Sequence, residues 1–196
     1  MRWTLGVAAL ATVTMCSGSM ARAADSLTGQ QIVIKGGVTR PTDGDVKAVG
    51  NDWFTYGAEY QFGDPDAKAV NGIELLYTKK SDTVTNVGTL GIPTDYSMFS
   101  LMLNHKIRRP DPDGTTAGKV FFYGAGVGVD FIRVKMDDPN PGGQTIDDKS
   151  TVLGGNLFAG YEFSSNVQLE LKYQIPFKKV NDTKFDGLQL LAGIKF

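Results

Sequence analysis

The sequence is poor in several residue types whose scarcity limits what the protein can be. Its 196 residues include one cysteine, Cys16, and one histidine, His105. A lone cysteine excludes an internal disulfide framework, and a net charge of −1 gives no sign of the basic surface of a nucleic-acid-binding protein. With 41% apolar and 21% charged residues, the composition excludes a disordered chain and a bundle of membrane helices. One folded domain of moderate size remains.

The first 23 residues have the features of a secretory signal peptide. Arg2 gives a short positive start, and an apolar run extends from Leu5 to Met15, too short for the ~20 residues of a membrane-spanning helix. Ala21-Arg22-Ala23 then fits a small-residue cleavage site. The sequence therefore predicts a cleaved signal peptide over residues 1–23 and an exported domain over residues 24–196, with no cysteine left.

Beyond the leader, apolar residues recur with a period of two, and no stretch has the 3.6-residue period of a helix. This alternation is typical of β-strands with two different faces. The sequence predicts eight strands, at residues 31–39, 51–62, 70–79, 95–107, 119–134, 151–163, 166–177 and 186–196.

The stretch KVFFYGAGVGVDFIRVK, residues 119–135, shows which face is which. Alternate residues from Phe121 to Phe131 are mostly bulky and apolar, whereas the residues between them include three glycines and Asp130. A soluble barrel, such as a lipocalin-like carrier, needs its bulk inside, so here the bulky face must point outward to lipid. From Phe121 to Phe131 a strand spans ~34 Å, or about 25 Å of height when tilted, which matches the apolar band of an outer membrane barrel.

Connection lengths also alternate. Connections one, three, five and seven have about 11, 15, 16 and 8 residues, and connections two, four and six have about 7, 11 and 2. Long loops at one end and mostly short turns at the other are typical of outer membrane barrels, although the fourth connection is longer than expected. The predicted fold is all-β: an eight-stranded antiparallel up-and-down transmembrane β-barrel, monomeric, with the first strand closing on the last.

The chain resembles the small OmpA- and OmpX-like outer membrane barrels of Gram-negative bacteria. The resemblance covers the predicted exported domain and rests on FFYGAGVGVDF (121–131), GGNLFAGYEFSSNVQLELKYQIPF (154–177) and GLQLLAGIKF (187–196). It implies a place in the cell outer membrane, among outer membrane lipids and lipopolysaccharide. It also implies periplasmic chaperones and the barrel assembly machinery as partners. That machinery would read the last strand, in which Phe196 fits the signal and Ile194 replaces the usual aromatic.

The predicted inner face carries ionisable residues of both signs in nearly equal number. Charges in a narrow tube persist only when they are paired, so these residues predict a salt-bridged plug of a largely closed lumen. The alternative is a narrow diffusion porin. Glu59 and Glu74 flank a short turn and should lie opposite each other, in need of a base. The predicted lumen residues are Lys35, Glu59, Glu74, Lys106, Asp130, Glu162, Glu170, Lys172 and Lys195.

Basic residues also gather at the predicted outer ends of the strands. Such a collar would meet the phosphates of lipopolysaccharide, and the alternative is ordinary solubilising loop charge. The predicted contacts are Lys79, Lys80, Arg133, Lys135, Lys178 and Lys179, with Lys149 and Lys184 nearby.

Motifs for chemistry are weak. Some barrels of this size are lipid A deacylases that carry serine two residues after a histidine, but Ile107 takes that place after His105. The GAGVG run lacks the third glycine and the following helix of a dinucleotide site. The sequence therefore predicts no catalytic residue, cofactor or metal site. It predicts a non-enzymatic structural or surface protein, with a lipid A-modifying enzyme as a further alternative.

Overall fold

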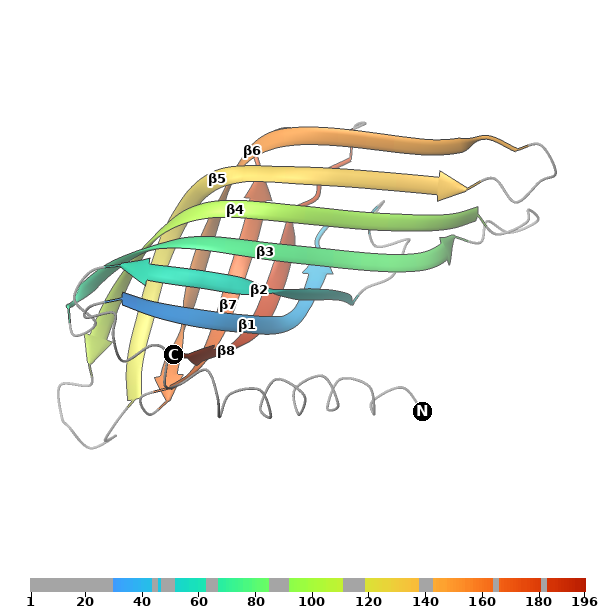
Figure 1. Cartoon of the computed structure of the whole chain (residues 1–196). Coiled ribbons are helices and arrows are strands. Elements are labelled where there is room, and N and C mark those ends of the chain that lie inside the picture. The colour runs from blue at the N-terminus through green and yellow to red at the C-terminus, as the bar shows by residue number, and fades with distance from the viewer. Residues whose placement is uncertain are drawn as a thin grey trace, which may run out of the picture.

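The chain folds into a closed barrel of eight antiparallel strands in which each strand pairs with its sequence neighbours and β1 pairs with β8 (Figure 1). The computed structural model describes residues 30–43, 46, 52–62, 67–84, 92–110, 119–137, 143–163, 166–180 and 183–196. The predicted fold class is confirmed. The strands are β1 (Gln30–Pro41), β2 (Trp53–Phe62), β3 (Ala69–Val84), β4 (Ile92–Pro110), β5 (Lys119–Asp137), β6 (Thr145–Phe163), β7 (Val167–Pro176) and β8 (Gly187–Lys195).

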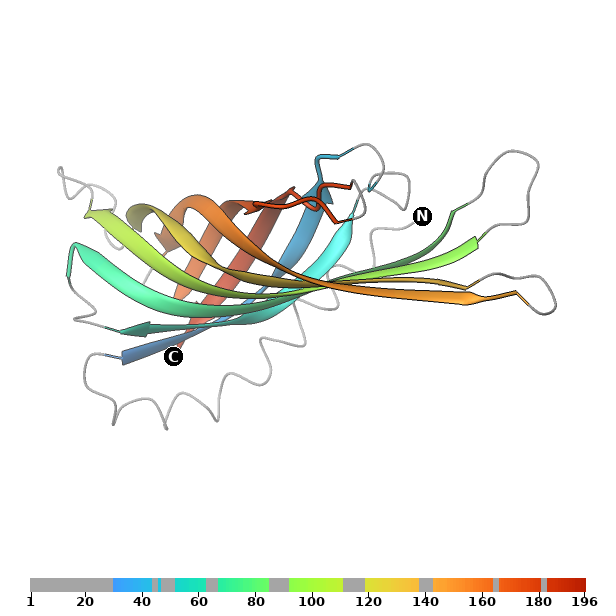
Figure 2. The ribbon, with the colours of Figure 1, turned by 90° about the horizontal axis from the view of Figure 1, so that it is seen from above.

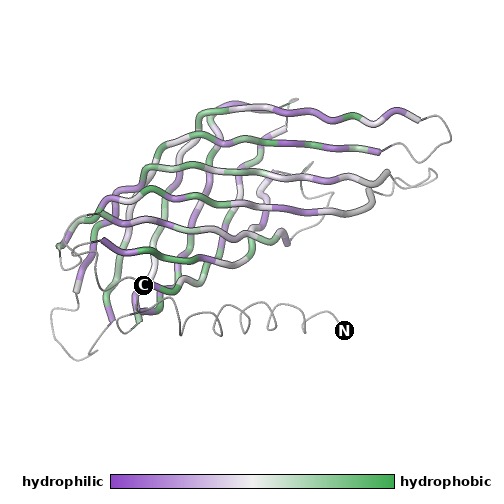
Figure 3. The backbone as a smooth tube through the Cα atoms, viewed as in Figure 1, coloured by the Kyte–Doolittle hydropathy of each residue, from purple (hydrophilic) through white to green (hydrophobic). Residues whose placement is uncertain are grey.

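The alternating pattern places bulky apolar side chains on the outside. Along β5, Val127 is 60% exposed and Phe131 is 44% exposed, whereas Phe122 and Asp130 are fully buried inside the barrel. In Figure 3 apolar and polar residues alternate along the strands of the barrel. A broad exposed apolar surface on a closed barrel is what a lipid environment requires. No helix among the described residues has the length and hydropathy needed to cross a membrane.

Glycines on the inner face permit close packing between strands. A Cβ atom added at Gly126 would lie 2.0 Å from Oδ1 of Asn104, and one at Gly128 would lie 2.0 Å from the backbone oxygen of Leu101. Both distances are far below van der Waals contact. The glycines of β5 are therefore needed for space in a narrow barrel.

Four strands are longer than the barrel requires. Strands β3, β4, β5 and β6 have 16, 19, 19 and 19 residues, whereas the other four have 9 to 12. Their outer parts leave the barrel together as a four-stranded sheet, seen at the right of Figures 1 and 2. We call this sheet the outer extension: residues 77–84, 92–99, 131–137 and 145–152.

The outer extension corrects the predicted strand ends and loop lengths. The third and fifth connections were expected to have about 15 and 16 residues, but β3 ends at Val84 before β4 begins at Ile92, and β5 ends at Asp137 before β6 begins at Thr145. Much of the expected loop is therefore strand. The sequence did not reveal it because the outer parts of β3 and β6 are polar at nearly every position, so the alternation of hydropathy is lost on those two strands.

The two ends of the barrel differ. One end carries the connections at 63–68, 111–118 and 164–166 together with residue 196, and we call it the inner end. The opposite end carries the outer extension, and we call it the outer end. Short turns at one end match the periplasmic side of outer membrane barrels.

Candidate functional site

All nine charged residues predicted for the lumen project into it, and each is at most 6% exposed. Each of the eight strands contributes at least one of them. Strand parity positions them, because residues of one alternate set all point toward the barrel axis.

The middle of the lumen contains a network around Lys35. Glu59 and Glu74 face each other across β2 and β3, as predicted from the short turn between them. The Nζ atom of Lys35 lies 2.7 Å from Oε2 of Glu59, 2.5 Å from Oε2 of Glu74 and 3.0 Å from Oε2 of Glu170. Lys172 contacts Glu74 and lies 2.9 Å from Glu170. Two ammonium groups thus hold three carboxylates. We call these five residues the middle network: Lys35, Lys172, Glu59, Glu74 and Glu170.

A second group of charges surrounds Glu162 nearer the inner end. Its carboxylate oxygens lie 2.6 Å from Nζ of Lys195, 3.3 Å from Nε of Arg108 and 3.9 Å from Nζ of Lys106. Lys106 also lies 3.9 Å from Glu59, so it links this group to the middle network. Apart from Asp130, the charged residues of the lumen therefore form one connected system.

Arg108 is a lumen residue that sequence reasoning missed. It is 7% exposed and its guanidinium lies 3.3 Å from both Glu162 and Oε1 of Gln61. The predicted strand ended at residue 107, whereas β4 continues to Pro110. Extending the alternation by one inward position past Lys106 would have found it, and with Arg108 the lumen acids and bases are equal in number.

Asp130 departs from the expectation that lumen charges are paired. Its carboxylate accepts hydrogen bonds from the Ser100 hydroxyl at 2.5 Å and from the Gln174 amide at 3.0 Å and 3.2 Å. No salt bridge involves it among the described residues. Neutral donors satisfy this carboxylate because β4 and β7 place polar side chains on either side of it.

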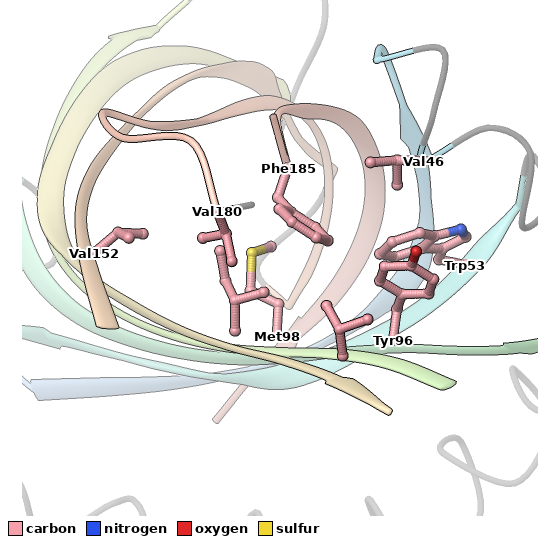
Figure 4. Packing of buried hydrophobic residues seen from close by; sticks show 9 residues of the cluster. Val46, Trp53, Tyr96, Met98, Val152, Val180 and Phe185 are labelled. Carbon is pink, nitrogen blue, oxygen red and sulfur yellow. The ribbon is translucent and has the colours of Figure 1, made fainter. Parts of the chain in front are cut away.

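The outer mouth of the lumen is apolar, which the sequence did not predict. Phe185 and Val180 come from the connection between β7 and β8 and pack over the inner wall (Figure 4). The ring of Tyr96 lies 5.7 Å from that of Phe185 and 5.6 Å from that of Trp53. We call this set the mouth cluster: Val46, Trp53, Tyr96, Met98, Ile132, Val134, Val152, Val180 and Phe185.

Aromatic rings fill part of the space between the charges. Phe122 and Phe158 pack together with centroids 6.4 Å apart, and Nζ of Lys106 lies 4.6 Å from the centre of the Phe122 ring. Aromatic rings thus lie among the charged side chains of the lumen, and the apolar mouth cluster lies at its outer mouth. This arrangement can hold the barrel closed at more than one level.

The predicted basic collar divides into several places. Lys79, Arg133 and Lys149 lie in one row across the outer extension, because each pairs in register with its neighbour or with Ser97. This row, which we call the outer row, follows directly after the aromatic row of Tyr77, Phe99 and Phe131.

Other members of the collar lie elsewhere. Lys80 belongs to the alternate set of β3 residues that faces inward, and the Lys135 ammonium lies 2.9 Å from the Asp137 carboxylate. Lys178 and Lys179 are exposed in the connection between β7 and β8. In the outer row Arg133 donates two hydrogen bonds of 2.7 Å to Asp147. These hydrogen bonds hold the pKa of the Asp147 carboxyl below its usual value.

His105 and its neighbours form a polar group on the outer surface near the inner end. The Nδ1 atom of His105 lies 2.8 Å from Oδ1 of Asn71 and donates to it, because an amide oxygen can only accept. Ile107 and then Arg109 follow on the same face of β4. Within the described ranges, no group of three or more potential metal-binding side chains was found.

The predicted assembly signal lies at the seam where the barrel closes. The backbone N–H of Phe196 donates to the oxygen of Ile32 at 2.8 Å, and that of Ile32 donates back at 3.2 Å. Ile194 pairs with Ile34 on β1 and with Val167 on β7. The end of the chain therefore joins the first strand to the last.

Comparison with known proteins agrees with this architecture. The family model for the outer membrane protein beta-barrel domain matches residues 8–196. Ail, the attachment invasion locus protein of Yersinia pestis, solved with the heparin analogue sucrose octasulfate, is similar at 15% identity with a TM-score of 0.57. That match covers 87% of this chain and 100% of Ail. Neisserial surface protein A is similar at 16% identity with a TM-score of 0.52, over 85% of this chain and 94% of that one.

These likenesses concern the fold, because the identities are low. A comparison with curated proteins finds no significant match.

Proposed function

The chain belongs to the outer membrane protein beta-barrel domain family, and on that basis we propose that it is a non-enzymatic surface protein with a closed lumen. Its activity would reside in the outer end, namely the outer extension and the connections there. The inner end then faces the periplasm. Signal-peptide export, periplasmic chaperones, the barrel assembly machinery and a monomeric state in the membrane are parts of the same proposal.

The observation that carries the closed lumen is its occupation at two levels. The middle network fills the centre of the barrel with charges joined by contacts of 3.0 Å or less to Lys35. The mouth cluster then closes the outer mouth of the lumen with residues that are at most 8% exposed. Small eight-stranded barrels generally have interiors filled by their own side chains.

Purified protein inserted into planar bilayers should give no stable open steps at neutral pH. An ion would have to displace the middle network, whose charges are buried and paired, and then pass the apolar mouth cluster. The measurement is single-channel current at fixed voltage, with the narrow diffusion porin as the competing function.

Insertion must be shown in the same preparation, by the faster migration of unheated folded barrel in detergent gels. Reproducible open steps of one size from folded protein would reject the closed lumen and support the porin. A variant with both Phe122 and Phe158 changed to alanine serves as the matched control, since it removes two of the rings that fill the lumen.

The outer row supports lipopolysaccharide as the lipid partner at the outer end. Along the strands, the outer row comes directly after the aromatic row, which marks the outer edge of the exposed apolar surface. The cations of the outer row are Lys79, Arg133 and Lys149. Aromatic residues lie at the interfaces of such barrels, so the next row is at headgroup level. Three cations at this level would meet lipid phosphates.

Changing Lys79 and Lys149 together to glutamine should weaken lipopolysaccharide binding by about tenfold, through loss of two charge-assisted contacts. Arg133 is left in place because it makes the short contact of 2.7 Å with Asp147, whereas Lys149 lies 3.7 Å from the same carboxylate. The same double change at Lys178 and Lys179, exposed in a loop, is the control and should bind as the wild type does. Equal loss in both variants, measured by titration in phosphate-free detergent, would favour ordinary loop charge.

A further inference from the structure

The outer surface of the barrel near the inner end carries a polar group that the closed lumen does not use. Arg109 and Tyr123 lie on neighbouring strands β4 and β5 and both face away from the lumen. An Nη atom of Arg109 donates to the Tyr123 hydroxyl at 3.3 Å, and the guanidinium carbon lies 5.5 Å from the centre of the Tyr123 ring. The tyrosine therefore holds the guanidinium against the barrel wall.

Arg109 lies at the edge of the exposed apolar band (the apolar belt) that is nearer the inner end. Arg109 pairs in register with Phe121, whose ring lies 6.1 Å from that of Tyr123 and 5.2 Å from that of Tyr161. Such a group of aromatic rings marks the membrane interface. On the inner side of an outer membrane, that interface is formed by the headgroups of glycerophospholipids.

The described surroundings of Arg109 suit an anion. Arg109 is exposed, and among the described residues at the inner end no exposed side chain is a carboxylate. Within the same described ranges, no salt bridge involves Arg109. An arginine presents a planar set of donors that matches two oxygens of a phosphate, and one bond to a phenol leaves several donors available.

A second polar pair lies deeper in the belt on the same face. Beyond Ile107, toward the middle of the membrane, His105 donates from Nδ1 to Asn71. The Asn71 amide retains its two N–H donors. In a glycerophospholipid the ester carbonyl oxygens lie deeper than the phosphate. The order of donors on the barrel thus follows the order of acceptors in the lipid.

We propose that Arg109, held by Tyr123, binds the phosphate of a glycerophospholipid in the periplasmic leaflet, with Asn71 and His105 facing its ester groups. This site anchors the barrel to the inner side of the membrane, opposite the outer row. It does not depend on whether the lumen is closed.

The test is native mass spectrometry of the full folded protein in dodecyl maltoside, titrated with palmitoyl-oleoyl phosphatidylglycerol. Arg109→Gln should weaken binding of the first lipid by about tenfold, and Tyr123→Phe by about threefold, as expected for loss of a charge-assisted contact and of its support. Lys119→Gln is the matched control, because this lysine lies on the same face without the tyrosine contact, and it should bind within about twofold of the wild type.

Two further arms make the result decisive. Monogalactosyl diacylglycerol, which has esters but no phosphate, should bind the wild type and Arg109→Gln equally. If Arg109→Gln does not fold, Arg109→Lys keeps the charge but loses the two-pronged geometry, and should bind phosphatidylglycerol about threefold more weakly than the wild type. Unchanged phosphatidylglycerol binding in the arginine variants, an equal loss in Lys119→Gln, or an equal loss for the glycolipid would overturn the proposal.

Discussion

Replacing Lys35 with methionine should lower the free energy of unfolding by about 3–5 kcal/mol, the usual loss when one partner of a buried ion pair is removed. The methionine side chain fills nearly the same volume, so the loss comes from charge. Glu59, Glu74 and Glu170 all lie within 3.0 Å of the Lys35 ammonium. Without it, three buried carboxylates would share Lys172 and the more distant Lys106.

Urea unfolding in lipid vesicles measures this loss, with tryptophan fluorescence as the signal. Trp53 is the only tryptophan after residue 23, and it is 3% exposed in the mouth cluster. Lys178→Met changes an exposed loop lysine and should leave the midpoint unchanged.

A second change distinguishes charge from packing. Adding Glu59→Gln to Lys35→Met removes one excess negative charge and should recover part of the lost stability. If the double variant is no more stable than Lys35→Met alone, the middle network does not hold the barrel through charge balance.

Changing Gly37 to alanine should prevent the barrel from closing, with a cost of more than about 4 kcal/mol, the range reserved for severe strain or lost packing. A Cβ atom at this position would lie 1.9 Å from the backbone oxygen of Leu190 and 2.9 Å from Cα of Leu191. These are backbone atoms of β8, so no side chain can rotate away. Strands β1 and β8 would have to separate at the seam.

The neighbouring glycine provides a matched control. A Cβ atom at Gly36, on the outward face of the same strand, has no atom within 4 Å, and neither glycine has a left-handed backbone, so the two differ in the space that the methyl group meets. Gly36→Ala should fold normally. The measurement is the fraction of protein that shows heat-modifiable migration after refolding. Equal folded fractions for the two variants would show that β8 can shift to admit the methyl group.

Much of the barrel follows from the sequence because strand parity is a rigid rule. Once Phe121 and Phe131 are assigned to the outside, Asp130 must point inward, and the same reasoning places Lys35 and Glu74 in the lumen. The pairing of Glu59 with Glu74 followed from one short turn. Parity gives the face of each residue but not its partners across the barrel. The contact between Lys35 and Glu170, 135 residues apart, therefore required the structure.

Two features could not be predicted, for different physical reasons. In the outer extension, β3 and β6 are polar at nearly every position, so in the sequence these parts resemble polar loops, although inward residues of β4 and β5 there pack in the mouth cluster. The mouth cluster combines inward residues such as Tyr96 with Val180 and Phe185 from a connection. A loop residue has no periodicity, so only tertiary contact shows that it packs inside.

The outer extension also determines how the protein presents itself to its surroundings. From Phe99 to Ile92 a strand advances seven residues, about 24 Å along the strand at ~3.4 Å each, so the β3–β4 and β5–β6 hairpins project beyond the barrel by that length. The β1–β2 and β7–β8 sides have no such elevation. A peptide tag grafted between β5 and β6 would lie far from the barrel, within reach of antibodies. The same tag between β7 and β8 would lie close to the mouth of the barrel.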